Sequence, residues 1–145
     1  MTYYEKEVVK IKEICYSNQG QIDTVIGTRN YINNNFENDL NLDLLSRIQL
    51  TSKYHLLRLF KKYYGLTPKQ YIIEKRIEKS KTYLKEGMTS SQTCFAVGFE
   101  SPGSFSTLFK NRIGLTPTQF QKKQLSRRDF RMNVQTCNHF INKTE

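Results

Sequence analysis

The chain has few of the residues on which catalysis, metal binding and disulfide cross-linking depend. It has two histidines, His55 and His139, three cysteines and no tryptophan in 145 residues. The cysteines, Cys15, Cys94 and Cys137, are odd in number and widely spaced, so they provide neither a disulfide framework nor a zinc site of the Cys-x-x-Cys type. No Ser-His-Asp arrangement, phosphate-binding loop or pair of catalytic carboxylates can be identified. We therefore predict that the protein is not an enzyme and uses no metal and no cofactor.

Long hydrophobic runs are absent as well. No apolar stretch approaches the roughly 20 residues that span a bilayer. The N-terminal sequence MTYYEKEVVK has acidic residues where a signal peptide has a basic start and an apolar stretch. Unpaired thiols also suit a reducing compartment. The sequence predicts a cytoplasmic protein that does not associate with a membrane.

Acidic residues are outnumbered by basic ones. Twenty-three lysines and arginines against thirteen acidic residues give a formal net charge of +10. Such an excess favours a polyanionic partner, and nucleic acid is the first candidate. A basic protein that is merely soluble is the alternative that charge alone leaves open.

The most informative feature is an internal repeat. Residues 52–72, SKYHLLRLFKKYYGLTPKQYI, match residues 101–121, SPGSFSTLFKNRIGLTPTQFQ, at a constant offset of 49, and nine of the 21 positions are identical. Each copy begins at a serine suited to an N-cap, ends its helix at a glycine, and starts another helix at Thr-Pro. The chain therefore contains two copies of one helical unit.

Within each copy, apolar residues recur at helical spacing and leave the opposite face more polar. In the first copy the expected inward residues are Leu56, Leu59, Phe60 and Tyr63, and the outward residues are Tyr54, Leu57, Arg58 and Lys61. In the second copy the expected inward residues are Phe105, Leu108, Phe109 and Ile113, and the outward residues are Gly103, Ser106, Thr107 and Lys110. Each helix thus has a core side and a presented side.

A short helix and a tight turn precede each copy. Asn41 can cap a helix from Leu42 to about Gln49, and a second short helix is expected from about Ser91 to Val97. Helix, short turn and basic helix form the helix-turn-helix arrangement, in which the second helix lies in the major groove of DNA.

Two further helices complete the predicted all-α fold. A long linker helix over residues 68–85, ended by Gly87, would join the two units. Its expected buried positions are Tyr71, Ile72, Ile77 and Leu84. A helix from Arg29, or somewhat before, to Phe36 would close the first unit. About seven helices are expected, with a possible N-terminal amphipathic helix in addition.

These motifs resemble the DNA-binding domain of the AraC/XylS family of bacterial transcription regulators over about Ile22 to Gln124. The motifs that match are SKYHLLRLFKK with GLTPKQYI, RIEKSKTYL, and VGFESPGSFSTLFKNRIGLTPTQF. The layout is similar to that of small stand-alone members, because no large sensor domain precedes the motifs. The resemblance implies a sequence-specific regulator that binds double-stranded DNA.

The resemblance also implies roles for residues in two recognition helices, at about 52–64 and 101–112. The residues expected at the DNA are Ser52, Lys53, Tyr54, Leu57, Arg58, Lys61 and Lys62 in the first helix, and Ser101, Gly103, Ser104, Thr107, Lys110 and Arg112 in the second. Independently of the resemblance, an arginine can contact a guanine edge through two hydrogen bonds, and an aromatic or leucine side chain can pack on a thymine methyl. Lysines near phosphates would make binding salt-dependent, although a solvated surface charge is the alternative for each.

The second unit departs from the family pattern. At the position of Thr107 the family usually has a basic or long polar residue, and it has long polar side chains near the position of Gly103. In this chain the presented face of the second recognition helix is therefore nearly bare. The preceding helix usually has apolar residues at Ser90 and Thr93 and an alanine at Cys94. A polar group that remains buried there costs about a kilocalorie per mole or more. We expect Cys94 to be a small core residue, with a redox-sensing thiol as the alternative.

The predicted domains leave two flanks. Residues 22–124 form the double helix-turn-helix domain, with units at about 22–67 and 88–124. Residues 1–21 form an amphipathic extension whose stripe is Tyr4, Val8, Ile11 and Cys15. We expect this segment to pack on its own domain, with pairing to a second copy or contact with RNA polymerase or a repressor as alternatives. We accordingly predict that the protein is a monomer or a weak dimer.

The C-terminal flank, residues 125–145, is basic and then polar. It carries Arg127, Arg128 and Arg131 and is expected to fray at its end. Two other functions remain open at this stage. One is a sequence-tolerant architectural DNA-binding protein, and the other is a protein-interaction module that uses the N-terminal segment.

Overall fold

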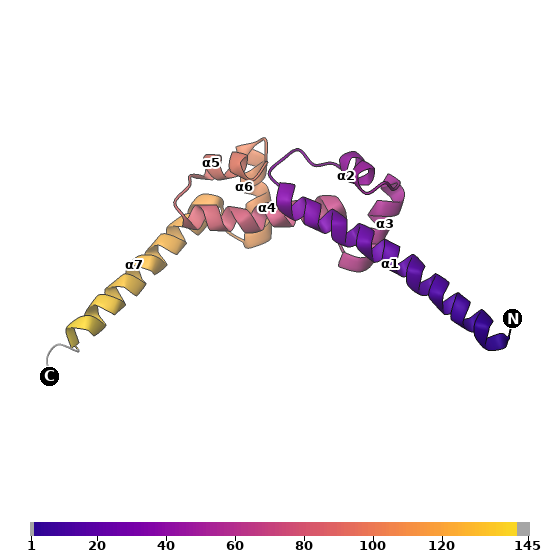
Figure 1. Cartoon of the computed structure of the whole chain (residues 1–145). Helices are drawn as coiled ribbons and strands as arrows, with labels where there is room; N and C mark the ends of the chain where they lie inside the picture. Colours follow the sequence, from indigo (N-terminus) through magenta and orange to yellow (C-terminus); the bar gives the residue numbers. More distant parts are fainter. Residues whose placement is uncertain (1, 142–145) are drawn as a thin grey trace. The chain divides into compact units, whose positions relative to one another are not determined.

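The computed structural model describes the backbone of residues 2–141, and the side chains in that range apart from those of residues 12–17 and 132–141. The described backbone forms seven α-helices and no strand, which confirms the all-α prediction. The helices are α1 (Tyr3–Asn35), α2 (Leu42–Ile48), α3 (Lys53–Tyr64), α4 (Pro68–Lys85), α5 (Ser90–Ala96), α6 (Pro102–Ile113) and α7 (Pro117–Ile141). The chain divides into two compact units, and the division falls within α4, between Lys75 and Arg76 (Figure 1).

Unit 1 is built around α3, which packs against both α1 and α2. Its core consists of Val25, Ile32, Leu45, Leu56, Leu59, Phe60 and Ile72. The inward positions of α3 match the prediction except at the last turn. Tyr63 is 39% exposed, whereas Tyr64 packs its ring 4.8 Å from that of Phe60 and 6.0 Å from that of Tyr71. The prediction for Tyr63 is wrong because Tyr71 on α4 packs against Tyr64 instead, whereas helical spacing from Leu56 and Phe60 suits both tyrosines.

The first helix is much longer than the predicted segment from Arg29 to Phe36. It starts at Tyr3, where the Thr2 hydroxyl accepts from the Glu5 amide and the Glu5 carboxylate accepts from the Thr2 amide. Among its described side chains, those that contribute to the core lie in the C-terminal half of the helix and include Val25 and Ile32. In Figure 1 the indigo half of α1 extends past α2 and α3, and no other element of unit 1 covers it.

The exposed half of α1 corrects the expectation that the N-terminal segment packs on its own domain. Tyr4 is 81% exposed, and Val8 and Ile11 are 49% and 56% exposed. Cys15, the fourth member of the predicted stripe, lies outside the described side chains. The segment is therefore a helical extension of unit 1 that presents its apolar stripe to solvent.

Unit 2 has a core of phenylalanines that pack in tilted and edge-to-face contacts. The Phe105 ring lies 5.3 Å from that of Phe99 and 5.8 Å from that of Phe109, which in turn lies 5.5 Å from Phe120 on α7. Helix α7 continues through residues 125–141, so the segment predicted as a separate tail is helical as far as Ile141. Residues 142–145, where fraying was expected, lie outside the described residues.

The two polar residues of α5 that stand where the family pattern has apolar residues differ in their burial. Ser90 begins the helix and is only partly buried, whereas Thr93 is fully buried and its hydroxyl has no hydrogen-bond partner among the described residues. The predicted cost therefore applies to Thr93. The Cys94 thiol is also fully buried, donates to the Phe99 carbonyl at 3.7 Å, and has its pKa raised by burial. Cys94 is thus a small core residue, as predicted.

The described residues contain neither a membrane-spanning helix nor a metal-binding cluster. No helix there is long and apolar enough to span a bilayer. In the same part of the chain, no three histidine, cysteine, aspartate or glutamate side chains gather where they could hold a metal ion.

Candidate nucleic-acid interface

The first candidate recognition helix is α3, and α2 and a tight turn position it. The Asn41 side chain caps α2 by accepting from the Leu44 amide at 2.9 Å, as predicted. The turn passes through Leu50, which has a φ of 52°. The Ser52 hydroxyl then caps α3 by accepting from the His55 amide at 3.2 Å. Short-range capping thus sets where α3 begins and leaves its first turn exposed.

The second candidate recognition helix, α6, is positioned in the same way. The preceding helix starts at Ser90, one residue before the predicted start, because Thr89 and Gln92 form a capping box. The turn passes through Gly98, which has a φ of 95°. The Ser101 hydroxyl caps α6 by accepting from the Ser104 amide at 3.4 Å. The two copies therefore share a helix, a turn with one residue of positive φ, and a serine cap.

Both recognition helices end at a glycine that the backbone requires. Gly65 and Gly114 have φ angles of 72° and 87°, in the left-handed region that strains other residues. The next helix starts in each case at a Thr-Pro step, with Thr67 and Thr116 forming capping boxes with Gln70 and Gln119. The identity of GLTP in the two copies is thus explained by local backbone geometry.

The presented face of α3 carries long side chains of several kinds. Tyr54 is 79% exposed, and Arg58, Lys61 and Lys62 are exposed beside it. The Lys62 ammonium lies 5.4 Å above the ring of Tyr63, the tyrosine that was predicted to be buried. These groups can donate hydrogen bonds, bind phosphates and contact apolar methyl groups.

Two predicted site residues of α3 also have partners within unit 1. The Lys53 ammonium forms an ion pair with the carboxylate of Asp43 on α2. Leu57 is half-buried and lines an apolar hollow of about 420 Å³, together with Leu42 and Pro68. Both side chains remain at the surface but are not wholly available to a partner.

The presented face of α6 is short and open, as predicted. Gly103, Ser104 and Thr107 are exposed and border a shallow depression. The Thr107 hydroxyl donates to the Gly103 carbonyl at 3.1 Å, so its proton is used within the helix. A Cβ added at Gly103 would come no closer than 3.9 Å to another residue, its nearest neighbour being Ser101. The fold therefore does not require glycine at this position.

One polar residue on the second face was missed by sequence reasoning. Asn111 is exposed and borders the same depression as Ser104 and Thr107. Its amide can donate and accept at once, as adenine recognition requires. The spacing of 104, 107 and 111 along one helical face could have identified it, as could the repeat offset, which pairs Asn111 with Lys62.

The remaining predicted site residues are at the surface. Lys110 and Arg112 are exposed in the last turn of α6. Ser52 and Ser101 are exposed at the helix starts, where their hydroxyls are used as caps.

Two helix-turn-helix units, each with an exposed second helix, define the class of the protein as a helix-turn-helix DNA-binding protein.

Comparisons with known proteins place it more narrowly. The helix-turn-helix domain family matches residues 45–123. The chain is 39% identical to an HTH-type transcriptional regulator of Pseudoalteromonas carrageenovora, over 63% of this chain and 55% of that protein. It is 37% identical to the bifunctional transcriptional activator/DNA repair enzyme AdaA of Bacillus subtilis, over 63% of this chain and 44% of AdaA.

Solved structures are also similar to this chain in fold. The C-terminal domain of AraT, a response regulator from Geobacillus stearothermophilus, is similar with a TM-score of 0.67 at 26% identity, over 69% of this chain and 84% of that one. The DNA-binding domain of AdpA, solved in complex with a target DNA, shares the fold with a TM-score of 0.69 at 18% identity, over 72% and 96%. The chain belongs to the AraC family of helix-turn-helix transcription regulators. It spans about half the length of the curated relatives it matches.

Proposed function

We propose that the protein is a sequence-specific transcription regulator that inserts α3 and α6 into adjacent major-groove segments of a promoter. The observation that carries this proposal is the repeated unit, in which a capped, solvent-exposed second helix follows a short helix and a tight turn. In helix-turn-helix proteins that second helix reads base edges. Two such units in one chain fit two successive groove segments.

In this proposal α3 supplies most of the base recognition. Arg58 is exposed, so its guanidinium can bond a guanine at two atoms. Tyr54 and Leu57 offer apolar surface to thymine methyls, and Lys53 offers an ammonium once it leaves Asp43. Lys61 and Lys62 contact phosphates, and the capped helix start at Ser52 adds backbone amides to them.

In this proposal the second recognition helix, α6, contributes mainly to the affinity for DNA. Ser104 and Thr107 reach a base edge only if the backbone of α6 comes very close, which the missing side chain at Gly103 permits. Lys110 and Arg112, together with the helix start at Ser101, bind phosphates and favour bent DNA. Asn111 is the only long, uncharged polar side chain on this face among the described residues, and so the best candidate there for reading a base.

The other partners follow from the same arrangement. A regulator of bacterial promoters acts in the cytoplasm on double-stranded DNA. The exposed apolar stripe on the N-terminal half of α1 is available to RNA polymerase or to a second copy, in a monomer or weak dimer. We propose no catalytic role, and the DNA repair activity in the name of AdaA is that protein's own.

A binding titration tests the proposal. The full chain is titrated with a duplex selected from random sequence and with an unselected duplex of the same length, at two salt concentrations. Specific complexes typically bind about 10³ to 10⁷ times more tightly than non-specific ones, and we expect a preference of this kind that survives at the higher salt concentration. Equal binding to both duplexes would reject it.

A sequence-tolerant architectural protein is the second candidate, and the bare face of α6 favours it. It predicts a steep fall of affinity with salt and little difference between duplexes in the same titration. The exposed stripe of α1 favours a third candidate, a protein-interaction module, which predicts weak binding to both duplexes.

A further inference from the structure

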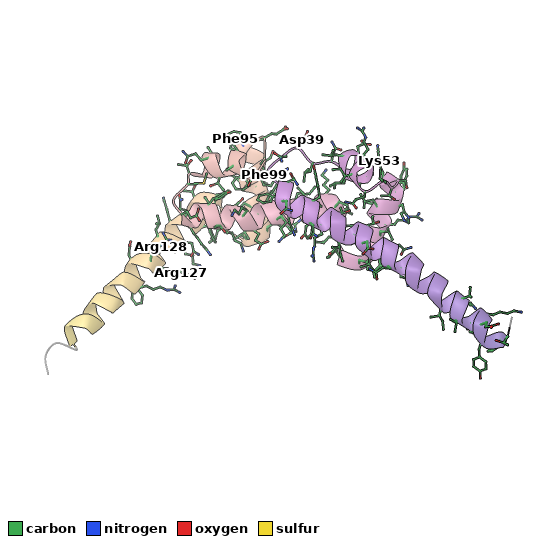
Figure 2. The ribbon with its side chains drawn as sticks, viewed as in Figure 1. Asp39, Lys53, Phe95, Phe99, Arg127 and Arg128 are labelled. Carbon is green, nitrogen blue, oxygen red and sulfur yellow. The ribbon has the colours of Figure 1, made fainter. Side chains whose placement is uncertain are left out.

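A cluster of basic side chains lies in unit 2 outside both helix-turn-helix motifs. Lys85 at the end of α4 and Arg127, Arg128 and Arg131 on α7 line a hollow of about 230 Å³, with Gln124 completing its wall. We name these four cations the α7 basic cluster. Figure 2 shows Arg127 and Arg128 on α7 beyond the part of the helix that packs in unit 2.

Hydrogen bonds from Gln121 bring together the two helices that carry the cluster. The Gln121 side-chain amide donates to the Leu84 carbonyl at 2.9 Å and to the Met88 carbonyl at 2.7 Å. This fixes α7 beside the end of α4, where Lys85 lies. Residues 124, 127, 128 and 131 then share one face of α7 because they follow helical spacing.

Within the described residues, no acidic side chain pairs with the α7 basic cluster. Asp129 is exposed but does not line the hollow. At the end of α4 the Leu84 carbonyl accepts from Gln121 rather than from an arginine of the cluster. Like charges held together without counter-charges repel, and an anion relieves that repulsion.

The cluster lies in a segment that carries much of the basic character of the chain. Lys85 and residues 122–131 together contain six lysines and arginines and one aspartate, a net charge of +5 out of the +10 of the whole sequence. Helix α6 contributes only Lys110 and Arg112. The excess charge of unit 2 is therefore concentrated away from its recognition helix.

We propose that the α7 basic cluster binds backbone phosphates of duplex DNA that flanks the segment contacted by α6. Helix α7 packs against α6 through the contact between Phe109 and Phe120. At a helical rise of about 1.5 Å per residue, the arginines lie roughly 10 to 16 Å along α7 from Phe120. This distance is comparable to the width of the major groove, about 12 Å, so the arginines are far enough from α6 to contact phosphates outside the groove segment that α6 would occupy. Arginine suits phosphate because its guanidinium donates two parallel hydrogen bonds.

The inference rests on the proposed DNA-binding function and predicts a specific salt dependence. Each phosphate contact adds about 0.9 to the slope of log affinity against log salt. Losing two contacts should lower the slope by about 1.8. The affinity ratio between the wild type and such a variant should then shrink by about 12-fold between 50 and 200 mM salt.

The test compares two double variants of the full chain that remove equal charge. Arg127→Gln with Arg128→Gln changes the cluster, and Lys6→Gln with Lys10→Gln changes two lysines on the exposed half of α1. Each is titrated with a selected duplex, and with the same duplex extended by about ten base pairs at each end, or roughly 34 Å. Thermal unfolding of both variants checks that each is folded before it is titrated.

We expect the wild type and the α1 variant to bind the extended duplex more tightly than the short one and to share one salt slope. The arginine variant should lose that gain and show the lower slope, while keeping its preference for the selected sequence. Equal slopes in both variants would overturn the inference and leave the proposed function intact. An absence of sequence preference in the wild type would instead reject the proposed function.

A final arm distinguishes DNA from a soluble phosphate. Inorganic pyrophosphate is titrated into the wild type and into the arginine variant in the absence of DNA. Binding to the wild type alone, together with equal DNA slopes, would assign the cluster to a soluble phosphate compound and overturn the DNA assignment.

Discussion

The Lys53 ammonium at the start of α3 forms an ion pair with the Asp43 carboxylate in the first turn of α2. Figure 2 shows Lys53 on unit 1. Both side chains are about half exposed, so the pair contributes little to stability. Its consequence is functional, because a lysine expected to face DNA is partly neutralised by a carboxylate that itself repels phosphates.

Replacing Asp43 by asparagine should therefore strengthen DNA binding. We expect Asp43→Asn to raise affinity several-fold for selected and random duplexes alike, and to steepen the salt slope by about 0.9, the value of one phosphate contact. Asp23→Asn is the control, because Asp23 is exposed on α1 and its carboxylate accepts from Gln19 rather than from a lysine expected at the DNA. Fluorescence anisotropy measures both. Equal gains in the two variants would show that only net charge matters.

Arg58 is predicted to read a base. Arg58→Ala should weaken binding to the selected site by about 1 to 3 kcal/mol and relax the preference at one base pair. Lys61→Ala, on the same exposed face, should weaken selected and random duplexes about equally. If Arg58→Ala also weakens both equally, Arg58 is a phosphate contact.

The buried hydroxyl of Thr93 is a local instability that can be removed. Thr93→Val keeps the shape of the side chain and removes an unpaired polar atom, so it should stabilise the protein by about 1 kcal/mol. Thr28 is the matched control, because its buried hydroxyl donates to the Thr24 carbonyl at 2.8 Å. Thr28→Val should not stabilise. Urea unfolding measures the free energy of unfolding of both variants and of the wild type. Destabilisation by Thr93→Val would show that the Thr93 hydroxyl of the wild type has a hydrogen-bond partner.

The N-terminal half of α1 is predicted to be dispensable for folding. Deletion of residues 1–20 removes the exposed stripe of Tyr4, Val8 and Ile11 and leaves Val25 and Ile32 in the core. The shortened protein should therefore keep a cooperative thermal transition. Loss of that transition, followed by circular dichroism, would mean that the extension contributes to the fold.

Much of the fold could be predicted because helix starts and ends depend on neighbouring residues. Asn41, Ser52 and the Gly-Leu-Thr-Pro blocks act through hydrogen bonds and backbone angles within a few positions. The length of α1 could not be predicted in this way. The sequence placed the end of an N-terminal extension at residue 21, but α1 continues through this position, and Gly20 inside the helix costs only about 1 kcal/mol.

Features that depend on distant residues were missed. Tyr63 and Tyr64 are identical in chemistry, and only Tyr71, seven residues beyond Tyr64, determines which of them packs inward. The pair of Lys53 with Asp43 joins two helices. The α7 basic cluster brings Lys85 to arginines more than 40 positions away. Such contacts form only when the helices pack, so residue spacing within one helix does not reveal them.

Selection of bound sites from random DNA, with every base pair scored, tests the central claim most directly. The wild-type protein should yield a site with two segments, and the preferences should be steep under α3, where Arg58 and Tyr54 are exposed, and shallow under α6, where Ser104 and Thr107 are short. The segments are assigned by repeating the selection with Arg58→Ala. A selected pool without base preferences would contradict sequence-specific recognition, and preferences under α6 as steep as those under α3 would contradict the unequal roles of the two helices.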